Sequence, residues 1–289
     1  MLDRFRVEAG AEFALANYPT SNPSPDSIDK VAAKSLLEAG ITRLGEHQEQ
    51  LYANATWSLL IVFQAMDAGG KDSIIKHVMS GVNPQGITVT SFKTPGREEL
   101  AHGFLWRVGK VLPARGMIGI FNRSHYEEVS FARVHPGLLG RQGIPARLRD
   151  DPAFWDHRLE DIACFERHLT RQGTAVLKFF LNVSKQEQRS RLLERLNDPA
   201  KHWKFDPADL DERDRWDDYM TAYSQAITAT ARPEAPWLVV PADQKWFARL
   251  IVVEAINEKL AGLGLHSPPL SSATAAELAS ARERLGCDS

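Results

Sequence analysis

The feature that most constrains this chain is a short apolar strand that runs directly into a glycine-rich turn. Residues 58–64 read SLLIVFQ, and AMDAGGKDS and then the helical pattern IIKHVMSG follow them. We call residues 65–73 the phosphate loop, because a strand, a glycine-rich turn and a helix N-terminus together bind anions through backbone amides and the helix dipole. We expect Lys71 to neutralise phosphates as a mobile point charge. The other phosphate-binding residues predicted here are Ala68, Gly69, Gly70, Asp72 and Ser73.

The loop departs from the usual G-x-x-x-x-G-K-[ST] pattern at two positions. Ala65 stands at the first glycine, and Asp72 takes the hydroxyl position, with Ser73 one place later. Because that hydroxyl normally holds magnesium, we expect the metal to be held differently here, by Asp67. A bare GGK also occurs in simple turns that expose a lysine. Its position between an apolar strand and a helix favours the phosphate site.

Apolar segments that alternate with helical segments predict the fold class. We expect strands at residues 58–64, 87–92, 116–121, 174–183 and 237–241. We expect helices at residues 28–51, 71–80, 98–111, 126–134, 155–171, 185–196, 211–231 and 243–263. This alternation is typical of an α/β protein with a doubly wound parallel five-stranded sheet. Together with the phosphate loop, it favours a sheet of the P-loop kinase type with a helical lid. Ligands of such sheets bind at the carboxyl ends of the strands.

The same pattern divides the chain into three parts. Residues 1–50 form an N-terminal helical arm, residues 51–264 a P-loop kinase domain with the lid at about 184–210, and residues 265–289 a tail. The tail segment SSATAAELASARERLG favours a short exposed helix, to which we assign no function.

Polar residues follow the third predicted strand, in the order Asn122, Arg123, Ser124, His125, Tyr126, Glu127 and Glu128. In P-loop proteins this strand lies beside the first, so we expect these residues to face the phosphate loop. Arg123 can grip two phosphate oxygens at once and stabilise the charge that develops in a transition state. Asn122 or Ser124 capping a helix, with glutamates in its first turn, explains the same residues without catalysis. The two interpretations are compatible.

The segment after the fourth predicted strand is locally basic. In nucleotide kinases this segment is a lid that closes over the donor phosphates, so we predict phosphate contacts from its cations. They are Arg189, Arg191, Arg195, Lys201 and Lys204. Helical spacing does not allow the three arginines all to point the same way. A solvated helix face is the alternative interpretation of the same residues.

Composition excludes several classes of protein. A formal net charge of −2 argues against a protein that coats nucleic acid. Cys164 and Cys287 have neither metal-ligand spacing nor a disulfide framework, which favours a reducing compartment. No secretory signal pattern is found, and no apolar run approaches the roughly 20 residues that span a bilayer. We therefore expect a cytoplasmic protein that acts on neither membranes nor nucleic acid.

Aromatic residues near the lid have two interpretations. Trp203, Trp216, Tyr219 and Tyr223 can stack on a base, but aromatic residues at helical spacing more often pack in a core. We predict packing.

Several long blocks of the sequence resemble one known family. The blocks are FQAMDAGGKDSIIKHVMSGVNPQG, SFKTPGREELAHGFLWR, LPARGMIGIFNRSHYEEV, KHWKF and APWLVVPADQKWFARL. They are similar to the polyphosphate kinase 2 family over roughly residues 5–263. The resemblance implies a P-loop kinase fold with a lid, magnesium as cofactor with manganese as a substitute, and phosphoryl transfer between polyphosphate and nucleotides. By residue-wise match it implies that Asp67, Lys71 and Arg123 are catalytic.

The resemblance also bears on the acceptor. FNRSHYEE resembles the subgroup said to accept both AMP and ADP, whereas the subgroup that prefers diphosphates shows an aspartate where Asn122 stands. Nucleotide contacts are assigned to Asn122, Glu127, Glu128 and Arg133, and the nucleotides expected are AMP, ADP and ATP, with guanine nucleotides as a further class. Gly103 and Asn182 depart from the family pattern, where aspartate and histidine are usual.

Three functions therefore remain open from the sequence. The first is a polyphosphate:nucleotide phosphotransferase, which we expect to be a homo-oligomer, either a dimer or a tetramer. The second is an ATP-dependent nucleoside monophosphate kinase on the same fold. The third is a non-catalytic sensor of nucleotide or polyphosphate, which the irregular phosphate loop suggests.

Overall fold

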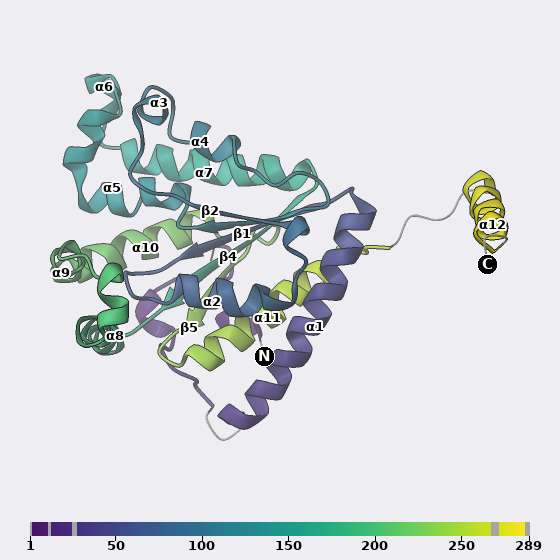
Figure 1. The fold of residues 1–289 in the computed structure, drawn as a ribbon. Coiled ribbons are helices and arrows are strands. Elements are labelled where there is room, and N and C mark those ends of the chain that lie inside the picture. Colours follow the sequence, from purple (N-terminus) through teal and green to yellow (C-terminus); the bar gives the residue numbers. More distant parts are fainter. Residues whose placement is uncertain (1, 11–12, 25–27, 267–271, 287–289) are drawn as a thin grey trace.

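A five-stranded, all-parallel sheet forms the centre of the molecule (Figure 1). The computed structural model describes residues 2–10, 13–24, 28–266 and 272–286. The strands lie in the order β2-β3-β1-β4-β5. They are β1 (Ser58–Gln64), β2 (Ile87–Ser91), β3 (Ile118–Asn122), β4 (Thr174–Asn182) and β5 (Trp237–Pro241). The predicted fold class and all five strands are confirmed.

Burial explains the strand sequences. All seven residues of β1 are buried, as expected for a central parallel strand covered on both faces. The edge strand β2 is half exposed and carries threonines. β3 begins two residues later than predicted, because Gly116 has φ 84° and turns the chain into the strand. Only glycine adopts this backbone conformation without strain.

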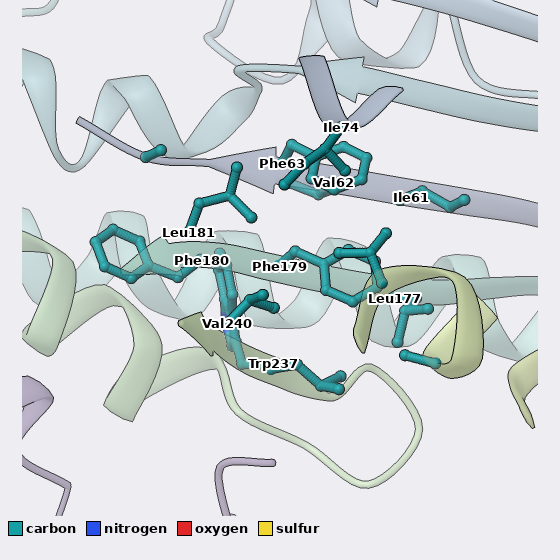
Figure 2. Packing of buried hydrophobic residues seen from close by; sticks show 14 of the residues in the cluster. Ile61, Val62, Phe63, Ile74, Leu177, Phe179, Phe180, Leu181, Trp237 and Val240 are labelled. Atoms are coloured by element: carbon teal, nitrogen blue, oxygen red, sulfur yellow. The ribbon is translucent and has the colours of Figure 1, made fainter. Parts of the chain in front are cut away.

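Helices cover both faces of the sheet (Figure 1). One face carries α2 (Lys71–Val78) and α11 (Lys245–Ala261), with α1 (Lys30–Asn54) packed along α11. The other face carries α7 (Phe154–Arg171) and α10 (Trp216–Thr230), with α5 (Phe131–Val134) packed on α10. Aromatic residues fill the layer between sheet and helices, and Phe63 stacks on Phe179 with ring centroids 5.1 Å apart (Figure 2).

The N-terminal arm is part of this core. Its first residues form two short 3₁₀ helices, η1 (Leu2–Phe5) and η2 (Leu15–Asn17). Phe5 is fully buried, and Arg6 forms an antiparallel bridge with Leu238 of the edge strand β5. The predicted boundary after residue 50 falls inside α1, so the arm and the sheet form one unit.

The tail contains one described helix, α12 (Ser272–Gly286), at the predicted place. Figure 1 shows it apart from the sheet. Cys287 lies outside the described residues. Within the described ranges, no helix combines the length and the apolar character needed to cross a membrane.

Three predicted helices are wrong in detail. Residues 98–111 form two short helices, α3 (Arg97–Leu100) and α4 (Trp106–Gly109), and the segment between them contains Gly103. Residues 126–134 form η5 (His125–Glu128) and α5, since the Ser130 hydroxyl and amide both donate to the Tyr126 carbonyl. Residues 211–231 divide at Arg215 into α9 (Ala208–Asp214) and α10.

The remaining elements lie in the connections. They are η3 (Met79–Gly81), η4 (Pro84–Gly86), η6 (Pro136–Arg141) and α6 (Ala146–Arg149), followed by α8 (Lys185–Asn197) and η7 (Pro199–Lys204). α8, η7 and the first residues of α9 lie in the lid predicted at about residues 184–210, and α9 continues beyond it to Asp214. We call residues 185–214 the lid segment.

Candidate active site

The phosphate loop has the backbone that an anion cradle needs. Gly70, the residue before α2, has φ 105°, and Ala68 has φ 58°. A Cβ added to Gly69 would lie 2.6 Å from the Ala65 Cβ and 2.8 Å from the Met66 carbonyl oxygen, so this position admits only glycine. The first amides of a helix have no intrahelical partner, which leaves those of α2 for a bound anion.

Lys71 is the first residue of α2, and its side chain is buried against the loop. Its Nζ donates to the Ala65 carbonyl at 2.9 Å and lies 3.5 Å from the Met66 carbonyl. Burial lowers the pKa of Lys71, as does Arg123, while Asp67, Glu127 and Asp72 oppose that shift. These interactions place Lys71 and Arg123 in one electrostatic site.

Arg123 follows β3 and faces the phosphate loop across the end of the sheet. Its Nη2 donates to Asp67 Oδ1 at 2.6 Å, and its Nη1 lies 3.8 Å from Glu127 Oε2. Partial burial disfavours its charge, but Glu127 and Asp67 raise the pKa of Arg123 above its ordinary value. Its φ of 63° is unusual for a residue with a Cβ, and such backbone conformations cluster at functional sites.

A small pocket lies over these groups. Its walls are made by Ala65, Met66, Asp67, Arg123, Glu127, Glu212, Tyr219 and Tyr223. The pocket therefore brings together the phosphate loop, the segment after β3, and the helices α9 and α10. Asp67 and Arg123, two of the three residues predicted to be catalytic, line this pocket. The third, Lys71, contacts the carbonyls of the lining residues Ala65 and Met66.

Glu127 is the carboxylate behind Arg123. Its side chain is 16% exposed, and burial raises its pKa even though Arg123 and Lys71 work in the opposite direction. With the Gln64 amide oriented to suit its neighbours, its nitrogen donates to Glu127 Oε1 at 2.9 Å. The Gln64 amide oxygen then accepts from the Ser124 hydroxyl at 3.0 Å. Glu127 thus lines the pocket, and its contact with a nucleotide stays a prediction.

Other predicted nucleotide contacts point elsewhere. Glu128 is buried between Arg107 and Arg158, with nitrogen–oxygen distances of 3.1 Å and 3.4 Å. The guanidinium of Arg133 lies 5.5 Å from the centre of the Trp155 ring. Both sets of contacts give these side chains a structural environment away from the pocket-lining residues.

Asn122 and two residues of the phosphate loop have partners of their own. Asn122 Nδ2 donates to Asp72 Oδ1 at 2.6 Å, so the end of β3 is joined to the start of α2. The Ser73 hydroxyl accepts from Arg249 of α11 at 3.0 Å, away from the usual role of a P-loop hydroxyl.

The predicted basic residues of the lid segment fall into two groups. Arg189, Lys201 and Lys204 are exposed, and Lys201 pairs with Asp198 at 3.0 Å. Arg195 donates to Asp209 at 3.2 Å, and Arg191 is buried against the phosphate loop. Trp203 is 79% exposed, so the packing prediction is wrong for this residue. Trp216, Tyr219 and Tyr223 are buried, as predicted.

Several residues of the site escaped sequence reasoning. Tyr219 and Tyr223 pack in the core, as predicted, and they also line the pocket, which the sequence did not indicate. Glu212 lines the pocket and accepts from the Tyr219 hydroxyl at 2.5 Å. Gln64 is a polar residue at the end of an apolar strand, and this position at the carboxyl edge of the sheet was an available signal.

The carboxylates of the pocket suit a magnesium ion. Within the described part of the chain, no group of three or more His, Cys, Asp or Glu side chains is arranged to hold a metal ion. Mg²⁺ is typically held by one or two carboxylates together with substrate phosphates and water, so it needs no such preformed cluster. Asp67, a phosphate-loop residue that lines the pocket, fits that requirement.

Comparison with known proteins adds a family to this geometry. The model of the family Polyphosphate kinase 2 (PPK2) matches residues 27–264. The ADP-polyphosphate phosphotransferase of Rhodopseudomonas palustris is 45% identical over 282 residues, covering 98% of this chain and 97% of that protein. The AMP/ADP-polyphosphate phosphotransferase of Meiothermus ruber is 41% identical over 273 residues, covering 94% of this chain and 98% of that protein.

A solved structure agrees with these sequence matches. The crystal structure of polyphosphate kinase 2 from Arthrobacter aurescens TC1 is similar with a TM-score of 0.88 and 43% identity, covering 97% of this chain and 96% of that chain. The resemblance seen in the sequence blocks is confirmed over nearly the whole chain. This chain belongs to the polyphosphate kinase 2 family.

Proposed function

We propose that this protein transfers the terminal phosphoryl group of inorganic polyphosphate to AMP or ADP, reversibly and by direct in-line displacement. The observation that carries the proposal is the ion pair of Arg123 with Asp67 in one pocket at the carboxyl ends of β1 and β3, with Lys71 bound to the carbonyls of two lining residues. The names of the two relatives, which specify ADP-polyphosphate and AMP/ADP-polyphosphate phosphotransfer, support the substrates.

The chemistry requires charge neutralisation more than proton transfer. A terminal phosphate oxygen of the nucleotide attacks the end phosphorus of the chain, and the bond from that phosphorus to the bridging oxygen breaks. The shortened polyphosphate leaves with the electron pair. Because the attacking oxygen is already anionic, alignment and electrostatic stabilisation supply most of the catalysis.

The site's cations have separate tasks in this proposal. Lys71 and the first amides of α2 hold the phosphates, and Arg123 turns from Asp67 and Glu127 to the transferring group. Asp67 would hold Mg²⁺, for which Mn²⁺ can substitute, and the bound ion supplies further positive charge to the phosphate oxygens. The lid cations Arg189, Arg195, Lys201 and Lys204 stay predicted phosphate contacts, as do guanine nucleotides as substrates and a homo-oligomeric assembly.

A donor exchange tests the proposal. The protein is incubated with AMP or ADP and Mg²⁺, with either long-chain polyphosphate or ATP as donor, and the products are separated by chromatography. We expect ADP and ATP to form with polyphosphate. Products formed from ATP alone would assign the protein to the ATP-dependent monophosphate kinases, and tight binding without turnover would make it a sensor.

A further inference from the structure

The guanidinium of Arg191 holds the phosphate loop from behind. Nε donates to Glu187 at 2.8 Å, and Nη1 donates to the carbonyls of Ala68 and Gly69 at 3.1 Å and 3.0 Å. Nη2 donates to the carbonyls of Ala242 and Asp243 at 2.5 Å and 3.2 Å. A guanidinium has five N–H donors, and all five have acceptors here. Arg191 therefore has no donor left for a phosphate.

Gln188 continues the same contact one turn earlier on α8. Its Nε2 donates to the Asp67 carbonyl at 3.0 Å, and its Oε1 accepts from Arg213 at 2.7 Å, which fixes the amide orientation. Residues three apart lie on one face of a helix, so Gln188 and Arg191 approach the loop together. We call these two side chains the loop clamp. Both are buried, with 1% and 5% of their surface exposed.

With the loop clamp in place, side chains hold every carbonyl from residue 65 to residue 69. Lys71 contacts those of Ala65 and Met66, and the clamp takes the next three. A trans peptide is planar, so the carbonyl of Gly69 and the amide of Gly70 point in opposite directions. When Arg191 binds the Gly69 carbonyl, the Gly70 amide points to the side opposite α8. There it can donate a hydrogen bond to a phosphate oxygen.

The clamp also offsets backbone strain. Ala68 has φ 58°, and left-handed conformations of residues with a Cβ persist only where the surroundings over-determine them. Arg191 restrains this conformation by donating hydrogen bonds to the carbonyls of Ala68 itself and of Gly69. The start of α8 is itself fixed, because the Ser184 amide donates to Asp243 at 2.7 Å.

We propose that Arg191, assisted by Gln188, is a positioning residue that keeps the phosphate loop in its anion-binding conformation and does not itself contact phosphate. This rests on the proposed phosphotransfer for its kinetic readout only. The proposal also replaces the prediction that Arg191 binds phosphate. Because the loop clamp fixes the first half of α8, closure of the lid segment is confined to residues beyond Arg191.

The test compares Arg191→Lys and Arg191→Ala with Arg282→Ala, an exposed arginine on α12. A lysine replaces a phosphate-binding arginine in part but cannot serve five acceptors in one plane. We expect kcat to fall about 10²-fold in both Arg191 variants, since small misplacements of binding groups have effects of that order. Arg282→Ala should keep the wild-type kcat.

Hydrogen–deuterium exchange of the peptide covering residues 65–75, without substrates, separates positioning from direct contact. We expect faster exchange in the Arg191 variants and no change in Arg282→Ala. Lost turnover with unchanged exchange would show that Arg191 touches the ligand, and an Arg191→Lys variant within threefold of wild-type kcat would equally overturn the proposal.

A milder variant covers the case in which Arg191 variants do not fold. Gln188→Met keeps the volume and removes both hydrogen bonds of the amide, of which only the one to the Asp67 carbonyl reaches the loop, so exchange in residues 65–75 should rise about fivefold. Unchanged exchange in Gln188→Met would contradict the clamp. Because the exchange readout needs no donor or acceptor, it stands whatever turnover the wild-type protein shows.

Discussion

Replacing Arg123 by glycine should separate activity from stability. The backbone of Arg123 has φ 63°, which costs a residue with a Cβ roughly 1–2 kcal/mol. Glycine relieves this strain but adds about 0.4–1 kcal/mol of unfolded-chain entropy. The ion pair with Asp67 is 40% exposed on the arginine side, and such pairs stabilise by about 0–1 kcal/mol.

These terms nearly cancel. We expect the free energy of unfolding of Arg123→Gly to stay within about 1 kcal/mol of wild type, a shift in Tm of about 2–4 °C for a chain of this size. The guanidinium that faces the transferring phosphate is lost completely. Arginines in this role contribute roughly 10³–10⁵-fold to kcat, so turnover should fall by that factor.

Ala55→Gly is the matched control for the backbone. Ala55 ends α1 with φ 50°, is exposed and lies outside the pocket. Its replacement should raise Tm slightly and leave kcat unchanged. The assays are thermal unfolding by circular dichroism and initial rates with polyphosphate and ADP. An Arg123→Gly variant with near-wild-type kcat, or one that loses more than about 10 °C in Tm, would refute the reasoning.

Three further predictions concern charge in and around the site. Lys178→Met should lower the unfolding free energy by about 3–5 kcal/mol in urea titrations, because the buried carboxylate of Glu166 loses its lysine partner at 2.5 Å and, among the described residues, keeps only Tyr126 and His125. Asn122→Asp should destabilise the protein by about 1 kcal/mol without divalent cations, since it faces the Asp72 carboxylate, and Mg²⁺ should restore the thermal stability. Burial and the charge of Asp67 raise the pKa of Asp209 to about 6. This group therefore stabilises the fold fully below pH 4 and loses that contribution as pH rises through 6. Asp209→Asn should flatten the dependence of the unfolding free energy on pH between pH 4 and 7. Unchanged urea midpoints, no response to Mg²⁺ and an unaltered pH slope would contradict the three in turn.

The sequence predicts the sheet and the phosphate loop well because both are determined locally. Apolar strands of the right length and a glycine-rich turn before a helix leave little choice of architecture. Asp67, Lys71 and Arg123 follow the ends of strands that the parallel topology places side by side, so their meeting could be expected. The helix ends were less predictable, since contacts such as the hydrogen bond from the Ser130 hydroxyl to the Tyr126 carbonyl depend on the local fold.

The roles of the lid arginines could not be read from the sequence. Arg191 and Arg195 differ by one helical turn, but one meets backbone carbonyls of the phosphate loop and the other an aspartate on α9. Glu127 and Glu128 are neighbours with opposite environments, one in the pocket and one in a buried pair of arginines. Periodicity places such residues on a helix face or in a turn, while tertiary packing decides what that face meets.

A crystal structure of the protein with ADP, Mg²⁺ and a non-hydrolysable polyphosphate analogue tests the central claim most directly. The distances from Lys71 Nζ and from the Arg123 guanidinium to the analogue are the quantities to measure. We predict that both groups lie within hydrogen-bond distance of phosphates in the same bound chain, next to the phosphate of ADP. An analogue bound away from either residue would contradict the account.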